Sequence, residues 1–228
     1  MSEREKILGR IREALKVEAH TPGAHGHASN QPTFDPKIST PRKWLPLVGH
    51  TVDEQLALFA KNSAELKTDF QLLNSAEEAR ATIVALRDKE RWKRVALHSG
   101  DLTNPICPPL NLPFLRTDKP YDVTELEKCD AGISECDALI AQTGSVLVTN
   151  RSAGGRALSV LPPHHVVLAR REQLVADLPA AFELLKKKYS ENYPSMISFI
   201  TGPSRTGDIE RILVLGAHGP KKLTVICF

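Results

Sequence analysis

The chain has 228 residues, of which 41% are hydrophobic and 25% are charged, and its formal net charge at neutral pH is +3. These values are ordinary for a globular protein, and the small charge without a basic and aromatic cluster argues against a nucleic-acid partner. No apolar stretch is long enough to cross a bilayer, and the first residues lack the apolar core of a signal peptide. We therefore expect a cytoplasmic protein with no membrane insertion.

The four cysteines are widely spaced and form no C-x-x-C pair: Cys107, Cys129, Cys136 and Cys227. They lack the spacing that iron–sulfur clusters and structural zinc sites require. The sequence therefore predicts buried, inert thiols and no cofactor held by this chain.

The first 50 residues differ in pattern from the rest of the chain. Residues 4–17 carry an apolar stripe at helical spacing, and an irregular, proline-containing stretch follows as far as Pro46. His20, His25 and His27 fall in this stretch without a carboxylate or thiolate, which favours a solvated loop over a metal site. We divide the chain into an N-terminal helix with its linker, residues 1–50, and an α/β domain, residues 51–228.

Helical and strand patterns alternate after residue 50. Helices are predicted at 52–67 and 75–90, the second opened by a capping box of Ser75 and Glu78, with apolar strands at 69–73 and 94–97. This alternation indicates a mostly parallel, Rossmann-like sheet with helices on both faces. Ligands bind such sheets beyond the carboxyl ends of strands, which makes His98, Ser99 and Asp101 second-rank site candidates beside the interpretation as a capped turn.

The second half of the chain repeats these patterns. A strand at 112–115 and a helix at 123–128 precede two apolar runs, Ala138 to Ala141 and Val146 to Val148, which predict a hairpin. An amphipathic helix over 172–189 is expected to be interrupted near Pro179. Residues 223–228 form a terminal strand that we expect inside the sheet.

Two polar turns stand out between these apolar runs. The hairpin turn carries Thr143, Gly144 and Ser145, and the second turn follows the apolar run 196–200. The second turn combines a glycine, two hydroxyls and a cation, namely Gly202, Ser204, Thr206 and Arg205, before Asp208, Glu210 and His218. Backbone N–H groups in such turns favour an anion, although the same residues also make ordinary caps and Arg205 could pair with Asp208.

Three motifs occur in order along the domain. They are G-I-S-x-x-x-A-x-I-A-Q-T-G-S at Gly132 to Ser145, S-V-L-P-P-H-H at Ser159 to His165, and G-P-S-R-T-G-D-I-E followed by G-A-H-G-P, ending at Pro220. Together they resemble the lactate utilisation protein C family, over roughly Thr51 to Phe228. Its LUD domain is similar to the glucosamine-phosphate deaminase, ribose-phosphate isomerase and CoA-transferase fold group.

The resemblance implies a bacterial protein required to oxidise L-lactate to pyruvate, together with companion subunits that carry iron–sulfur centres. The family more often has Glu where this chain has Gln142, and Thr where it has Ser145. If that Glu were an obligate base or metal ligand, this chain would have lost or modified the activity.

The first hypothesis is therefore a subunit that binds a small hydroxy- or keto-carboxylate at the two turns. Arg205 would hold the carboxylate, while Thr143, Ser145, Ser204 and Thr206 would donate hydrogen bonds. Asp208, Glu210 or His218 would handle a proton, and electrons would pass to a partner subunit. This hypothesis requires the two turns to converge on a shared hollow at one rim of the sheet, with room for the acid beside Arg205.

Two alternatives belong to other classes. The domain could be a non-catalytic assembly subunit whose polar turns are structural and whose N-terminal helix docks on a partner. By fold analogy it could also act on sugar phosphates or CoA esters, with Glu135 as the candidate nucleophile.

Overall fold

The computed structural model describes residues 45–206, 214–215 and 219–228, all within the unit Arg42–Phe228. The predicted N-terminal helix, most of its linker and His20, His25 and His27 lie outside the described residues. No helix in the described part of the chain is long and apolar enough to cross a membrane.

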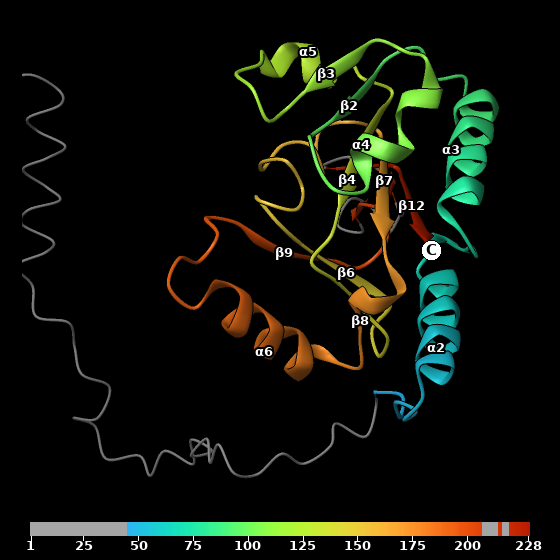
Figure 1. Ribbon diagram of the computed structural model, residues 1–228, viewed down its shortest axis with the longest axis vertical. Coiled ribbons are helices and arrows are strands. Elements are labelled where there is room, and N and C mark those ends of the chain that lie inside the picture. Colours follow the sequence, from blue (N-terminus) through green and yellow to red (C-terminus); the bar gives the residue numbers. More distant parts are fainter. Residues whose placement is uncertain (1–44, 207–213, 216–218) are drawn as a thin grey trace, which may run out of the picture. The chain divides into compact units, whose positions relative to one another are not determined.

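A six-stranded sheet forms the centre of the domain (Figure 1). Its order is β1 (Asp69–Leu72), β12 (Lys222–Cys227), β7 (His164–Ala169), β4 (Ala131–Glu135), β2 (Val95–Leu97) and β3 (Phe114–Arg116). Every neighbouring pair is parallel, which confirms the predicted α/β class. The C-terminal strand β12 lies between β1 and β7, inside the sheet as predicted.

Side chains along each strand alternate in direction, so the buried strands present apolar side chains on both faces of the sheet. Helices pack on both faces. On one face, Val166 and Leu168 of β7 pack in the core that contains Ile83 of α3 (Ala76–Glu90) and the end of α4 (Thr103–Ile106). On the other face, Val167 packs in the core that contains Phe59 of α2 (Val52–Glu65). The short helix α5 (Val123–Glu127) adds Leu126 beside Ala96 of β2.

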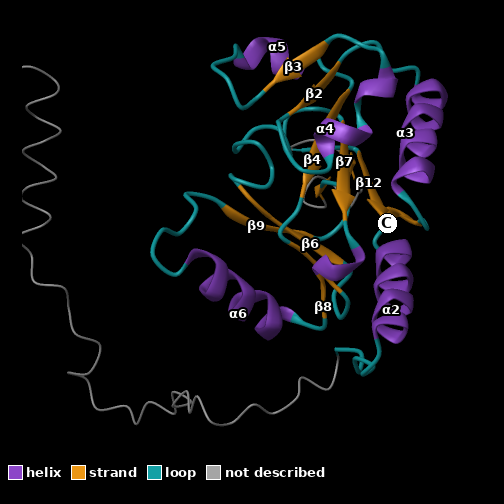
Figure 2. Cartoon of the chain, in the orientation of Figure 1, coloured by secondary structure: helices purple, strands orange, loops and turns teal. Residues whose placement is uncertain are grey.

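A second, four-stranded sheet was not predicted from the sequence (Figure 2). Its order is β8 (Leu174–Val175), β5 (Ala138–Ile140), β6 (Ser145–Thr149) and β9 (Ile197–Ile200). The antiparallel pairing of β5 with β6 confirms the expected hairpin. The inner face of this sheet packs on the six-stranded sheet, and its outer face packs on α6 (Leu178–Tyr189). A further antiparallel pair joins β10 (Arg205–Thr206) to β11 (Val214–Leu215).

One predicted helix boundary and one predicted capping box need correction. Residues 172–189 do not form one helix: a 3₁₀ turn η2 (Arg171–Gln173) and strand β8 come first, and α6 starts after its N-cap Asp177. Pro179 therefore lies in the first turn of α6, where its missing N–H costs no hydrogen bond. The capping box at α3 is incomplete, since the Ser75 hydroxyl accepts from the Glu78 N–H but the Glu78 carboxylate accepts from the Asn74 N–H.

The adjacent strands β2 and β4 form a topological switch point. After β2 the chain turns to the face of α3, where α4 and the following 3₁₀ helix η1 (Pro108–Leu110) join that core. After β4 it turns to the opposite face and enters β5. Ligands of open α/β sheets bind in the crevice that such divergent connections leave outside the carboxyl ends of the strands.

Candidate functional site

The two predicted turns lie side by side in the described structure. Ser145 Oγ lies 2.8 Å from Thr201 Oγ1, which joins the β5–β6 hairpin to the segment that enters the Gly202 turn. Both turns meet at the C-terminal end of α2. Contacts with each other and with the end of α2 therefore bring the two turns together.

The described groups of these turns mainly hold α2 in place. The Asn62 side chain donates to the backbone carbonyls of Ala141 and Gln142, at 2.9 Å each. A Cβ at Gly144 would come within 2.9 Å of Asn62, and a Cβ at Gly202 within 2.8 Å of the Leu66 carbonyl oxygen. These close approaches leave no room for a ligand between the turns and α2.

Of the remaining described polar groups of the turns, only Arg205 also contacts α2. The Arg205 guanidinium donates to the Leu66 carbonyl at the end of α2. The Thr143 hydroxyl is buried without a hydrogen-bond partner in the described structure. The Gln142 side chain donates to the Pro46 carbonyl at 3.1 Å, which is a structural use of the position where the family more often has Glu.

Asp208, Glu210 and His218 lie outside the described residues, as does the side chain of Thr206. Ser204 is partly buried, and its backbone N–H donates to the Pro220 carbonyl at 2.9 Å. Ligand binding and proton transfer at the two turns therefore stay a prediction.

A second polar cluster lies at the carboxyl ends of β2, β3 and β4, and we call it the switch-point cluster. It contains His98 and Ser99 after β2, Arg116 at the end of β3, Asp118 just beyond it, and Glu135 at the end of β4. His98 and Ser99 were predicted as second-rank candidates, whereas Arg116 and Asp118 were missed. The signal was available, because every parallel strand delivers the residues at its carboxyl end to the same edge of the sheet.

Glu135 is anchored through one carboxylate oxygen. Its Oε1 accepts from the backbone N–H groups of Leu102 and Thr103, at 2.8 and 3.0 Å, and lies 3.3 Å from Thr103 Oγ1. Within the described structure no donor is recorded for Oε2, and that atom is not among the buried polar atoms without a partner. A Cβ at Gly100 would lie 2.0 Å from Oε1, so only glycine leaves the carboxylate in this place.

His98 supports Glu135 through the backbone. The Nδ1 atom lies 3.0 Å from the Ser99 carbonyl oxygen, and Nε2 accepts from the Glu135 N–H at 3.4 Å. Both ring nitrogens therefore contact backbone groups, so His98 helps to position the end of β4.

Ser99 and Asp118 close the cluster on its exposed side. The Asp118 carboxylate accepts from the Ser99 N–H at 3.0 Å and lies 3.3 Å from the Ser99 hydroxyl. Burial opposes the ionised form, but the hydrogen bonds and the nearby Arg116 lower the pKa of Asp118 overall. Asp101, the remaining second-rank candidate, is exposed at the start of the α4 turn.

An ion pair with a buried carboxylate lies in the link between β4 and β5, at Asp137. Asp137 accepts hydrogen bonds of 2.6 Å from Lys188 Nζ, the Tyr189 hydroxyl and the Ser152 hydroxyl, and its side chain is fully buried. Burial works against ionisation, but these partners lower the pKa of Asp137 overall. All three partners come from α6 or the loop after β6, so this network ties those elements to the link between β4 and β5.

His164 and His165 point to opposite faces of the sheet, as neighbours on one strand must. Their Nε2 atoms lie 2.9 Å from Thr224 Oγ1 and 2.8 Å from Ser134 Oγ, respectively. Burial lowers the pKa of His164 to about 4 and that of His165 to about 3. Both rings are therefore neutral near pH 7 and act as core residues.

The thiols also behave as core groups. All four cysteines are free and buried, which agrees with the prediction. Burial raises the pKa of Cys107 to about 12 and that of Cys227 to about 11, so neither is a ready thiolate ligand. Among the described residues, no group of three His, Cys, Asp or Glu side chains has metal-binding geometry.

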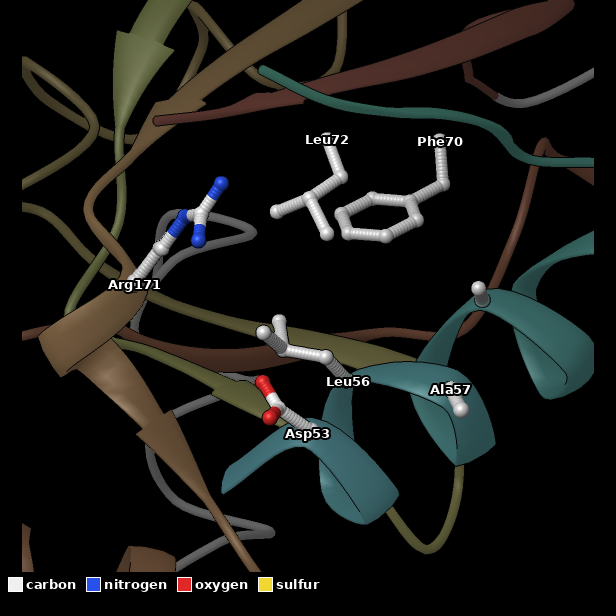
Figure 3. Close-up of a pocket in the computed structure, with 7 residues that line it drawn as sticks. Asp53, Leu56, Ala57, Phe70, Leu72 and Arg171 are labelled. Atoms are coloured by element: carbon white, nitrogen blue, oxygen red, sulfur yellow. The ribbon is translucent and has the colours of Figure 1, made fainter. Parts of the chain in front are cut away.

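A hollow of about 350 Å³ lies between α2 and the edge strand β1 (Figure 3). Phe70 and Leu72 point from β1 toward Leu56 of α2, with Asp53 and Arg171 at the rim. The Arg171 guanidinium donates to the Leu73 carbonyl at 2.8 Å. Among the residues that line this hollow, only Asp53 and Arg171 are polar, and the others give it an apolar floor.

Comparison with known proteins identifies relatives across most of the chain. A family model described as LUD domain matches residues 122–228. Lactate utilization protein C of Anoxybacillus flavithermus is 31% identical over 174 residues, 72% of this chain and 70% of that protein. The protein of the same name from Geobacillus kaustophilus is 29% identical over 216 residues, 84% of this chain and 85% of that one.

A solved structure shares the fold. The crystal structure of a DUF162 family protein from Deinococcus radiodurans matches with a TM-score of 0.60 and 23% identity, covering 80% of this chain and 99% of that one. At this identity the similarity establishes the fold alone, and any function has to be argued from the residues of this chain.

Proposed function

The chain belongs to the lactate utilization protein C family, and on that basis we propose that it is a subunit of a bacterial system that oxidises L-lactate to pyruvate. The similarity to relatives of that name, over 70% and 85% of their lengths, is the observation that carries the proposal. The role assigned to this subunit is to bind the small anionic acid.

The electrons leave through companion subunits that carry iron–sulfur centres. Oxidation of an alcohol carbon requires an electron acceptor, and the cysteines of this chain have neither cluster spacing nor an environment that favours thiolates. In this proposal the present chain binds the acid, and the companion subunits accept the electrons.

Anaerobic reconstitution tests this proposal. The companion subunits are purified with and without this chain, L-lactate is added, and the visible absorbance of the clusters is followed. We expect lactate to bleach the clusters only when this chain is present. Equal bleaching without it would refute a role in the oxidation.

A non-catalytic assembly role is the second candidate, favoured by the use of the described turn groups to hold α2. Under this alternative the isolated chain binds no small acid, and its removal disperses the companion subunits in size-exclusion chromatography. Binding of lactate by the isolated chain would contradict it.

A further inference from the structure

The switch-point cluster places a cation and a carboxylate on the same face of the sheet. Arg116 is in register with Leu97, and Glu135 lies two residues beyond Ile133 on the neighbouring strand. Leu97 and Ile133 both lie in the core on the α3 face. Because side chains alternate along a strand, Arg116 and Glu135 also emerge on that face.

A short chain of contacts links the two charged groups. Arg116 Nη1 donates to the His98 carbonyl at 3.3 Å, and Thr103 Oγ1 lies 2.9 Å from that carbonyl and 3.3 Å from Glu135 Oε1. No ion pair joins Arg116 to Glu135 in the described structure. The guanidinium and the carboxylate are therefore neighbours that do not neutralise each other directly.

Arg116 has donors to spare. Its recorded bonds are the one to the His98 carbonyl and a 3.5 Å contact with Ser99 Oγ, both through Nη1. A guanidinium has five N–H donors in a planar fork that matches a carboxylate. None of its nitrogens is among the buried atoms without a partner, so the unused donors are accessible.

Glu135 offers the complementary group. Its Oε1 accepts hydrogen bonds from the α4 backbone, which leaves Oε2 to accept a hydrogen bond from a ligand. An ionised carboxylate accepts hydrogen bonds and donates none. A guest here must therefore combine an anionic group for Arg116 with a hydroxyl that donates to Glu135.

Resting on the proposed function, we infer that the switch-point cluster is the binding site for the acid and selects 2-hydroxy acids over 2-oxo acids. Arg116 holds the carboxylate and Glu135 Oε2 accepts the hydrogen bond of the 2-hydroxyl. A 2-oxo acid has only lone pairs at that position, which face the lone pairs of Glu135. The site therefore retains L-lactate and releases pyruvate.

The expected difference in affinity between L-lactate and pyruvate follows from the hydrogen bond between the 2-hydroxyl and the Glu135 carboxylate. A hydrogen bond to an ionised group contributes more than a neutral one, and its loss corresponds to about a 10- to 100-fold weaker affinity. We therefore expect pyruvate to bind the full chain about 10- to 100-fold more weakly than L-lactate.

Titration calorimetry of the full chain with L-lactate and with pyruvate tests the inference. Glu135→Gln keeps the size and an oxygen acceptor for the α4 backbone, but it can present an N–H group to the ligand. We expect this variant to lose the preference for lactate, so that the ratio of the two dissociation constants falls to within about threefold of unity. Arg116→Ala should lose binding of both acids.

Lys119→Ala is the matched control, because it removes an exposed cation three residues after Arg116 and should leave the affinity for lactate unchanged. Arg205→Ala tests the competing site at the Gly202 turn, because lactate bound there would lose its cation. Thermal unfolding of each variant confirms that the fold is retained. The inference is overturned if Glu135→Gln keeps the wild-type preference, if Arg205→Ala abolishes binding, or if the folded full chain binds neither acid. Cluster bleaching in the reconstituted system is independent of these titrations, so it still decides the proposed function.

Discussion

Removal of the buried Asp137 carboxylate is expected to destabilise the protein more than removal of any exposed ion-pair partner. The perturbation is Asp137→Ala. The side chain is fully buried and accepts three hydrogen bonds of 2.6 Å, from Lys188, Tyr189 and Ser152. These partners connect the link between β4 and β5 to α6 and to the loop after β6, so the change loosens three segments at once.

The expected loss can be worked out from this geometry. Breaking a buried ion pair by removing one partner costs about 3–5 kcal/mol, because the other charge stays buried and unpaired. The Lys188 side chain is 50% exposed and can turn toward water, which lowers that cost. The Tyr189 and Ser152 hydroxyls then lose a charged acceptor, at about 1–3 kcal/mol for each buried group left unsatisfied. We expect a net loss of about 3 kcal/mol, since such contributions do not add fully.

Urea unfolding of wild type and variant, followed by far-ultraviolet circular dichroism, measures this loss. The dependence of the unfolding free energy on urea should stay the same, so that a change in midpoint reports stability alone. Glu77→Ala is the matched control, because Glu77 pairs with Arg80 on the surface with its side chain 81% exposed, and it should cost less than about 1 kcal/mol. A loss below about 1 kcal/mol for Asp137→Ala, or equal losses for both variants, would refute the reasoning.

Three further predictions follow from single positions. Gly144→Ala should cost at least about 2 kcal/mol in urea unfolding, because φ is +64° and the new Cβ would press on the α2 backbone at Asn62; a loss under about 1 kcal/mol would contradict this. Burial lowers the pKa of His165 from 6.5 in the unfolded chain to about 3 in the folded protein. Between these two values only the unfolded state binds a proton at His165, so the free energy of unfolding decreases as the pH is lowered. His165→Gln should therefore lose about 2 kcal/mol less than wild type between pH 7 and pH 5, and equal losses would argue against the buried neutral ring. Gly100→Ala should push the Glu135 carboxylate off the α4 backbone, weakening lactate binding about tenfold or more and lowering the unfolding midpoint; unchanged affinity would count against the placement of Glu135.

The sequence determined much of the fold, because the decisive signals are local. The capping hydroxyls of Thr51 and Ser75 mark the starts of α2 and α3, and apolar runs mark the buried strands. The hairpin between β5 and β6 was visible from Gly144, whose positive φ the turn requires. The family motifs likewise follow from the order of residues alone.

Predictions from the sequence failed where a feature depends on distant partners. Residues 174–175 were predicted as part of a helix, but they pair with β5 and lie in the second sheet. Pairing between strands is invisible to local periodicity, so the four-stranded sheet was missed. The polar turn at Arg205 was ranked first for its density of functional groups, yet its described cation binds the end of α2.

Only the tertiary structure brought the switch-point cluster together. Ser99, Arg116 and Glu135 are separated by 17 and by 19 residues along the chain, and no local pattern links them. They meet because β2, β3 and β4 are parallel neighbours whose carboxyl ends share one edge of the sheet. The order of amino acids decides which residues end each strand, whereas the order of strands in the sheet decides which of those residues face one ligand.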